Sequence, residues 1–138
     1  MIDKFGNAFY LIIYLAHFII VGSYAYQLVF DTKKFLKGRG VDKTATLITR
    51  FAGSFMIATV LMAIYVGFIR AGGLDNTWAF FNLIFLQNAA AFVFAIWSHQ
   101  KGNLGVNSKT SIEGIVAPGV LTLLSAVLCY GLADKIYS

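Results

Sequence analysis

The sequence is poor in charged residues, in cysteine and in proline. Asp, Glu, Lys and Arg make up 12% of its 138 residues, whereas 59% are hydrophobic. An ordinary soluble domain has roughly 25% charged residues, so this composition indicates an integral membrane protein. The lone Cys129 excludes an intramolecular disulfide, a Cys-x-x-Cys redox motif and a metal site built from several thiolates.

Acidic residues are absent from the interior of the apolar segments. All six lie at or beyond the ends of those segments, namely Asp3, Asp31, Asp42, Asp75, Glu113 and Asp134. A proton path through a membrane normally needs ionisable side chains along its length, so this placement argues against a proton-coupled transporter. Paired carboxylates and clusters with metal-ligand spacing are also missing from the sequence, and we predict neither a catalytic site nor a metal site.

Four apolar segments are long enough to cross a membrane. The most distinctive is 76–100, which has no charged residue and carries Trp78 and Trp97 near its ends, where aromatic rings favour the membrane interface. At about 1.5 Å per residue it can cross a hydrocarbon layer of roughly 30 Å. The other segments are 5–30, 51–69 and 112–133. The sequence therefore predicts an all-α polytopic membrane protein, a compact bundle of four transmembrane helices that forms one domain over 1–138.

The connections between the segments are short and contain turn residues. A tight turn at 71–76 predicts that the second and third segments are antiparallel neighbours. The sequence Thr110–Glu113 fits a capping box, in which Glu113 reaches back to the start of the fourth helix. Pro118 falls in the second turn of that helix and is expected to kink it or to loosen its first turn.

The basic residues are distributed unevenly between the connections. Connections rich in Lys and Arg stay in the cytoplasm, which predicts that both termini are non-cytoplasmic. We expect a multi-pass protein of a bacterial or archaeal cytoplasmic membrane or of an organellar inner membrane. The orientation in the membrane then accounts for the net charge of +5, and we predict no nucleic acid as a partner. Eight of the 11 basic residues lie in or beside the first and third connections: Lys33, Lys34, Lys37, Arg39, Lys43, Arg50, Lys101 and Lys109.

Small residues recur at every fourth position in the second and third segments. This spacing lets helix backbones approach each other closely inside a membrane. We therefore predict helix-packing roles for Ser54, Ala58, Thr59, Ala63, Gly67, Ala91 and Ala95.

Polar side chains are predicted to meet at the middle of the bundle. His17 and Asn88 each lie midway between the charged residues that flank their segments, so the two side chains reach a similar depth. Tyr14 shares a helix face with His17, and Gln87 precedes Asn88 in the chain. Neighbouring amides at mid-bilayer depth are costly unless another helix satisfies them. We predict polar bundle contacts among His17, Gln87, Asn88 and Tyr14.

An intramembrane histidine is also a candidate cofactor ligand. His99 lies about 11 residues beyond Asn88, or about 16 Å along the helix, so His17 and His99 of one copy cannot share a haem. Ligation of a haem or a chlorophyll-like pigment by His17 alone stays open. The sequence otherwise requires no cofactor.

The lack of catalytic residues and the abundant packing surface favour a non-catalytic accessory or assembly subunit of a larger membrane complex. The 13 Phe residues suit contact with other membrane subunits and with lipids. Complexes of the respiratory, photosynthetic and membrane-oxygenase types are all candidates. Two alternatives stay open: a homo-oligomeric channel or carrier for a small neutral solute, and a haem- or pigment-holding subunit that uses His17.

Overall fold

Four long helices form the structure, a computed structural model that describes residues 2–102 and 110–138. Met1 and 103–109, which include Lys109 of the third connection, lie outside the described residues. The helices are α1 (Ala8–Val29), α3 (Thr46–Ile64), α4 (Trp78–Lys101) and α5 (Glu113–Gly131). With its short extensions, each is long and apolar enough to span a membrane. The predicted fold class, an all-α protein with four membrane-spanning helices packed together, is confirmed.

The second span begins earlier than its hydropathy predicts. A single 3₁₀ turn, Lys43–Ala45, leads directly into α3, which therefore starts at Thr46 and includes Arg50. The carboxylate of Asp42 accepts from the N–H of Thr44 at 2.8 Å and caps this turn. Arg50 is tolerated inside the helix because its side chain is exposed and its Nε donates to Thr32 Oγ1 at 3.3 Å.

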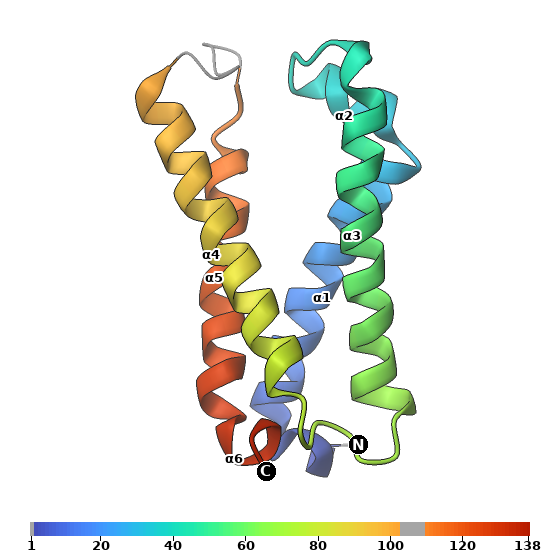
Figure 1. Cartoon of the computed structure of the whole chain (residues 1–138), viewed down its shortest axis with the longest axis vertical. Coiled ribbons are helices and arrows are strands. Elements are labelled where there is room, and N and C mark those ends of the chain that lie inside the picture. The colour runs from blue at the N-terminus through green and yellow to red at the C-terminus, as the bar shows by residue number, and fades with distance from the viewer. Residues whose placement is uncertain (1, 103–109) are drawn as a thin grey trace.

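The four long helices form two pairs that are joined at one end (Figure 1). α1 packs against α3, α4 packs against α5, and α1 also contacts α5. A short helix, α2 (Thr32–Gly38), packs on both α1 and α3, and α6 (Ala133–Ile136) ends the chain. In Figure 1 the pairs meet at the end that carries both termini and diverge toward the end that carries α2.

The second and third spans were predicted to be antiparallel neighbours; they are antiparallel (Figure 1), but the prediction that they pack as neighbours is wrong. α3 and α4, both described in full, belong to different pairs (Figure 1). Hydrogen bonds hold the connection between α3 and α4 in place where it passes from one helix pair to the other. Arg70 Nη1 donates to the carbonyl of Gly73 at 3.1 Å, and Lys4 Nζ donates to the carbonyl of Arg70 at 3.3 Å. Leu74 is almost completely buried, so this connection is part of the core.

The core lies at the joined end of the two pairs. Its aromatic centre is Tyr14, whose ring packs edge-on against Phe5 and Phe18 at centroid distances of 4.8 and 4.6 Å. The Tyr14 hydroxyl donates to the carbonyl of Ala63 at 2.6 Å and links α1 to α3. Other buried members come from the end of α3, the connection after it, α4 and the C-terminal part of the chain: Val66, Leu74, Phe81, Ile84, Leu128, Leu132 and Ile136.

α3 ends in a wide turn that brings it close to α1. The residues Tyr65–Ile69 form a π-helical turn, closed by a hydrogen bond of 2.8 Å from the N–H of Arg70 to the carbonyl of Tyr65. Gly67 lies in this turn against Tyr14, and a Cβ at Gly67 would be only 3.0 Å from the Tyr14 hydroxyl oxygen. The absence of a side chain at Gly67 therefore lets the tyrosine reach the backbone of α3.

The contact between α1 and α3 follows a spacing of seven residues on α3. A Cβ at Gly53 would be 2.6 Å from Val29 Cγ2, and Val60 Cγ2 would be 3.9 Å from a Cβ at Gly22. Gly67 continues the series against Tyr14. Seven residues are nearly two turns, so these positions share one helix face.

Three of the small residues with a predicted packing role do not pack against another helix in the described part of this chain. Ser54 and Ala58 are exposed, because α1 contacts the face of Gly53 rather than the face of Ser54. Ala91 on α4 is also exposed. Ala63 and Gly67 are buried, and Thr59 and Ala95 are half-buried.

The start of α5 also differs from the prediction. The helix begins at Glu113, so this residue is not at the third helical position that a capping box requires. The Ser111 hydroxyl accepts from the N–H of Glu113 at 3.2 Å instead. The side chain of Glu113 is thereby available to the other helix pair, and α5 continues through Pro118 to Gly131.

Candidate functional site

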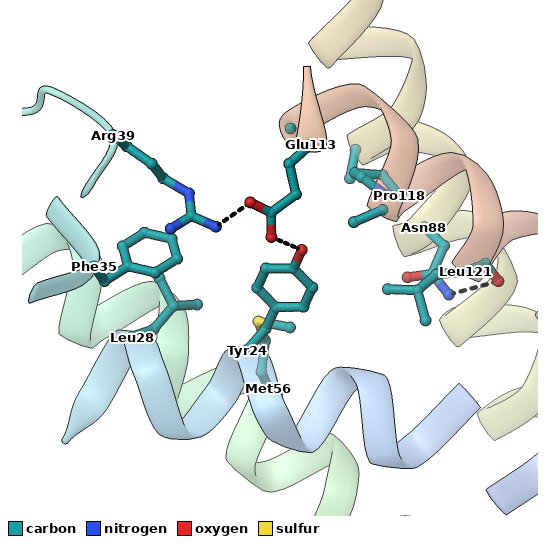
Figure 2. Close-up of a pocket in the computed structure, with 12 residues that line it drawn as sticks. Tyr24, Leu28, Phe35, Arg39, Met56, Asn88, Glu113, Pro118 and Leu121 are labelled. Carbon is teal, nitrogen blue, oxygen red and sulfur yellow. Dashed lines mark hydrogen bonds and ion pairs between the residues drawn. The ribbon is translucent and has the colours of Figure 1, made fainter. Parts of the chain in front are cut away.

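A cavity of about 270 Å³ lies between the two helix pairs, at the end where they diverge. All four long helices and α2 contribute to its wall, which is mostly apolar. Figure 2 shows its polar groups in two places, one at the start of α5 and one further along that helix. The lining residues are Tyr24, Leu28, Phe35, Arg39, Met56, Asn88, Ala91, Glu113, Gly114, Ala117, Pro118 and Leu121.

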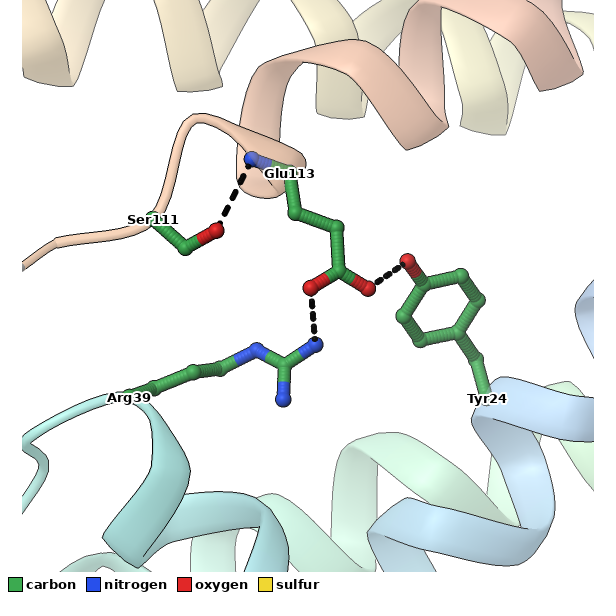
Figure 3. A network of polar contacts seen from close by, with 4 residues as sticks. All are labelled: Tyr24, Arg39, Ser111 and Glu113. Atoms are coloured by element: carbon green, nitrogen blue, oxygen red, sulfur yellow. Dashed lines mark hydrogen bonds and ion pairs between the residues drawn. The ribbon is translucent and has the colours of Figure 1, made fainter.

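The first polar group is a three-residue network around Glu113 (Figure 3). Arg39, which follows α2, places its Nη2 atom 3.0 Å from Glu113 Oε2. The hydroxyl of Tyr24 on α1 donates to the other carboxylate oxygen. The ring of Phe35 stacks under the Arg39 guanidinium, 3.8 Å from its central carbon, and fixes its orientation. The network connects one helix pair to the other.

The network is a positioning device more than a source of stability. The side chains of Arg39 and Glu113 are 24% and 48% exposed. Ion pairs with this degree of solvent contact contribute roughly 0–1 kcal/mol. The charges of Arg39 and Glu113 cancel, so this end of the cavity is polar but carries no net charge.

The second polar group is centred on Asn88. Its side-chain nitrogen, Nδ2, lies 2.9 Å from His17 Nε2 and 3.4 Å from both the carbonyl of Leu121 and Ser125 Oγ. Ser125 donates its own proton to that carbonyl at 2.7 Å, so its oxygen is free to accept. The Leu121 carbonyl can only accept, which assigns the amide nitrogen of Asn88 to this position.

This arrangement also fixes the proton of His17. Because the Asn88 amide donates to Nε2, the neutral imidazole carries its proton on Nδ1. The ring is completely buried, and Nδ1 has no hydrogen-bond partner among the described residues. His17 therefore acts as a buried acceptor that holds the amide of Asn88 in one orientation.

The amide oxygen of Asn88 is the accessible atom of this group. In Figure 2 it lies on the opposite side of the amide from the Leu121 carbonyl, on the side of the cavity. The structure shows no hydrogen-bond donor to this oxygen within 2–102 and 110–138. The Asn88 amide oxygen thus offers an acceptor to the cavity, beside apolar residues such as Leu121 and Ala91.

The four residues predicted to form polar bundle contacts do not meet at one place. His17 and Asn88 are in direct contact across α1 and α4. Tyr14 bonds instead to the carbonyl of Ala63 on α3. Gln87 is exposed on the outer face of α4 and has no hydrogen-bond partner in the described part of the chain. The backbone explains the split, because consecutive helical residues point about 100° apart.

His17 is poorly placed to ligate a haem or a pigment. Its Nε2 atom already accepts from Asn88, and its ring is buried inside the protein. His99 donates from Nδ1 to the carbonyl of Ala95 at 2.9 Å within its own helix, and its Nε2 atom is buried without a hydrogen-bond partner among the described residues. Among the described residues, no group of three or more His, Cys, Asp and Glu side chains could hold a metal ion.

Sequence reasoning missed the network of Tyr24, Arg39 and Glu113. One signal was present: Arg39 in the first connection and Glu113 at the start of the fourth segment have opposite charge and were assigned to the same side of the membrane. Comparison with protein-family models, with curated proteins and with solved structures finds no match.

Proposed function

We propose that this chain is a non-catalytic subunit of a larger membrane complex and that it docks through the outer face of α4. α4 is the least buried of the four spans. Its exposed residues include a set at alternating spacings of four and three, which we call the outer stripe: Leu83, Gln87, Ala90, Phe94 and Trp97. This spacing places the set on one helix face, the geometry with which two helices pack along their length.

The single observation that carries the proposal is the exposure of Gln87 in the middle of α4. An amide surrounded by lipid chains loses hydrogen bonds that nothing in the hydrocarbon replaces. A neighbouring transmembrane helix with a hydroxyl, amide or carbonyl group at that depth would restore them. Ala90, one turn away, is small enough to let such a helix approach closely.

The distribution of charge supports an orientation for the subunit. Basic α2 and Lys101 lie at the end where the helix pairs diverge, and both termini lie at the joined end. With the basic end in the cytoplasm, the termini would be non-cytoplasmic and Gln87 would lie near the bilayer centre.

A photo-crosslinking amino acid at Ala90 tests the proposal in the native membrane. We expect adducts with a chain of different sequence, and migration in mild detergent with a complex much larger than 15.2 kDa. The matched control is the same crosslinker at Ala58, which is also exposed but lies on α3. It should give lipid adducts or none.

Adducts between copies of this chain alone would refute the proposal. If such a homo-oligomer also carried a solute across vesicle membranes, the channel or carrier hypothesis would replace it. Recovery of the protein as a monomer only, with no adduct at Ala90, would equally refute docking through the outer stripe.

A further inference from the structure

The cavity between the helix pairs has the composition of a small-molecule site. Its wall is apolar along Leu28, Met56, Ala117 and Leu121, and its polar groups are confined to the two places described above. Ligand pockets in proteins are mainly apolar with a few polar groups that fix orientation. Their usual volumes are about 300–1,000 Å³. The cavity, at about 270 Å³, suits an occupant of modest size.

The polar groups of the cavity restrict the charge of that occupant. Arg39 and Glu113 neutralise each other, so neither offers an unmatched charge to a ligand. Apolar walls make the transfer of a charged group from water costly unless an opposite charge awaits it. The occupant is therefore uncharged and soluble in the membrane.

The unpaired atom of Asn88 restricts the hydrogen-bonding of the occupant. Nδ2 faces His17, Leu121 and Ser125, so the amide cannot turn over without placing its oxygen against the carbonyl of Leu121. The cavity consequently presents an acceptor, and a ligand carbonyl or ether would meet a lone pair there. A hydroxyl group would donate to it and complete the polar network.

We propose that this cavity binds a small, uncharged alkylphenol, with the phenolic hydroxyl donating to the Asn88 amide oxygen. The flat side chains of Tyr24, Phe35 and Pro118 line the same cavity and suit an aromatic ring. The alkyl group lies along the apolar wall. This site is independent of the outer stripe of α4, because Asn88 and Gln87 point to different sides of the helix.

Two probes of nearly equal shape test the hydrogen bond. The purified full chain in phosphatidylcholine nanodiscs is titrated with 4-butylphenol and with 4-butylanisole, whose methyl ether cannot donate. Binding is measured by saturation-transfer NMR and corrected for uptake into empty nanodiscs. Because one net hydrogen bond separates the two probes, the phenol should bind about five- to tenfold more tightly.

Two alanines on exposed helix faces locate the site. Ala91 lines the cavity, and Ala91→Leu should abolish binding of both probes by filling it. Ala52, exposed on α3, is the matched control, and Ala52→Leu should leave both affinities unchanged. Asn88→Leu should retain the anisole and lose the preference for the phenol. If Asn88→Leu does not fold, the comparison of Ala91→Leu with Ala52→Leu still shows whether the probes bind in the cavity.

Equal affinity of the unmodified chain for the two probes would overturn the assigned hydrogen bond. Phenol binding that survives Ala91→Leu would place the ligand elsewhere and overturn the assigned site. Absence of saturable binding by either probe would overturn the whole proposal. None of these results bears on docking through the outer stripe, which the crosslinking at Ala90 tests separately.

Discussion

The contact between His17 and Asn88 should be measurable as a coupling free energy. His17→Leu and Asn88→Leu replace each polar side chain by an apolar one of similar size, which limits changes in packing. Asn88→Leu leaves His17 Nε2 without the donor that lies 2.9 Å away. His17→Leu leaves the amide of Asn88 with two longer contacts of 3.4 Å, to Leu121 and to Ser125.

The expected size of the coupling follows from the geometry. Hydrogen bonds between membrane helices average about 0.6 kcal/mol in double-mutant cycles and reach about 1.7 kcal/mol. The His17 ring is completely buried and its contact with Asn88 is short, so we expect the upper half of this range, about 1 kcal/mol. The double variant should therefore lose about 1 kcal/mol less unfolding free energy than the sum of the single variants.

Reversible unfolding in lipid bicelles, followed by tryptophan fluorescence, gives the four free energies of unfolding. A control cycle combines Asn88→Leu with Tyr14→Phe, which removes the hydrogen bond from Tyr14 to Ala63. That cycle should be additive within about 0.3–0.5 kcal/mol. If the cycle of His17 and Asn88 were equally additive, the two side chains would not interact and the assigned tautomer of His17 would lose its basis.

The close approach of α5 to α1 and the membrane orientation give two further predictions. Gly131→Ala would place a Cβ 2.1 Å from Tyr10 Cε1 and should lower the unfolding free energy by about 1–3 kcal/mol, whereas Gly22→Ala, 3.9 Å from its nearest neighbour, should be neutral or stabilising. Thermal unfolding measures the stability of both variants. Equal stability of Gly131→Ala and Gly22→Ala would contradict the close contact between Gly131 and Tyr10. For orientation, Lys37→Cys in a Cys129→Ser background should react with an impermeant maleimide only after cells are permeabilised, and labelling of intact cells would reverse the assigned topology.

The spans could be predicted from the sequence, but the pairing of the helices could not. Long uncharged segments such as 76–100 determine where the chain crosses a membrane, because each charge inside the hydrocarbon is costly. Helix pairing depends on shape, since lipid and protein are equally apolar partners for a side chain such as Phe. The face of Gly53 packs against α1, whereas the similar face of Ser54 and Ala58 is exposed.

The candidate site shows the same division between local and tertiary information. The depths of His17 and Asn88 could be read from the charges that flank their spans, and the structure places the two side chains in contact. The partners of Glu113 could not be read locally. Its capping pattern suggested a bond within its own helix, but the fold brings Arg39 within 3.0 Å of its carboxylate. Only the packing of the two helix pairs creates that contact.

The π-helical turn Tyr65–Ile69 makes α3 tolerant of a change in length at one place. A π turn contains one residue more than the α turn it replaces, and the part of α3 that precedes it keeps its faces. Loss of one residue there would leave Gly53 against α1 and Arg70 at the start of the next connection. The same loss near the middle of α3 would rotate one half of the helix by about 100° relative to the other. Homologous chains that differ in length within this helix should therefore differ at Tyr65–Ile69.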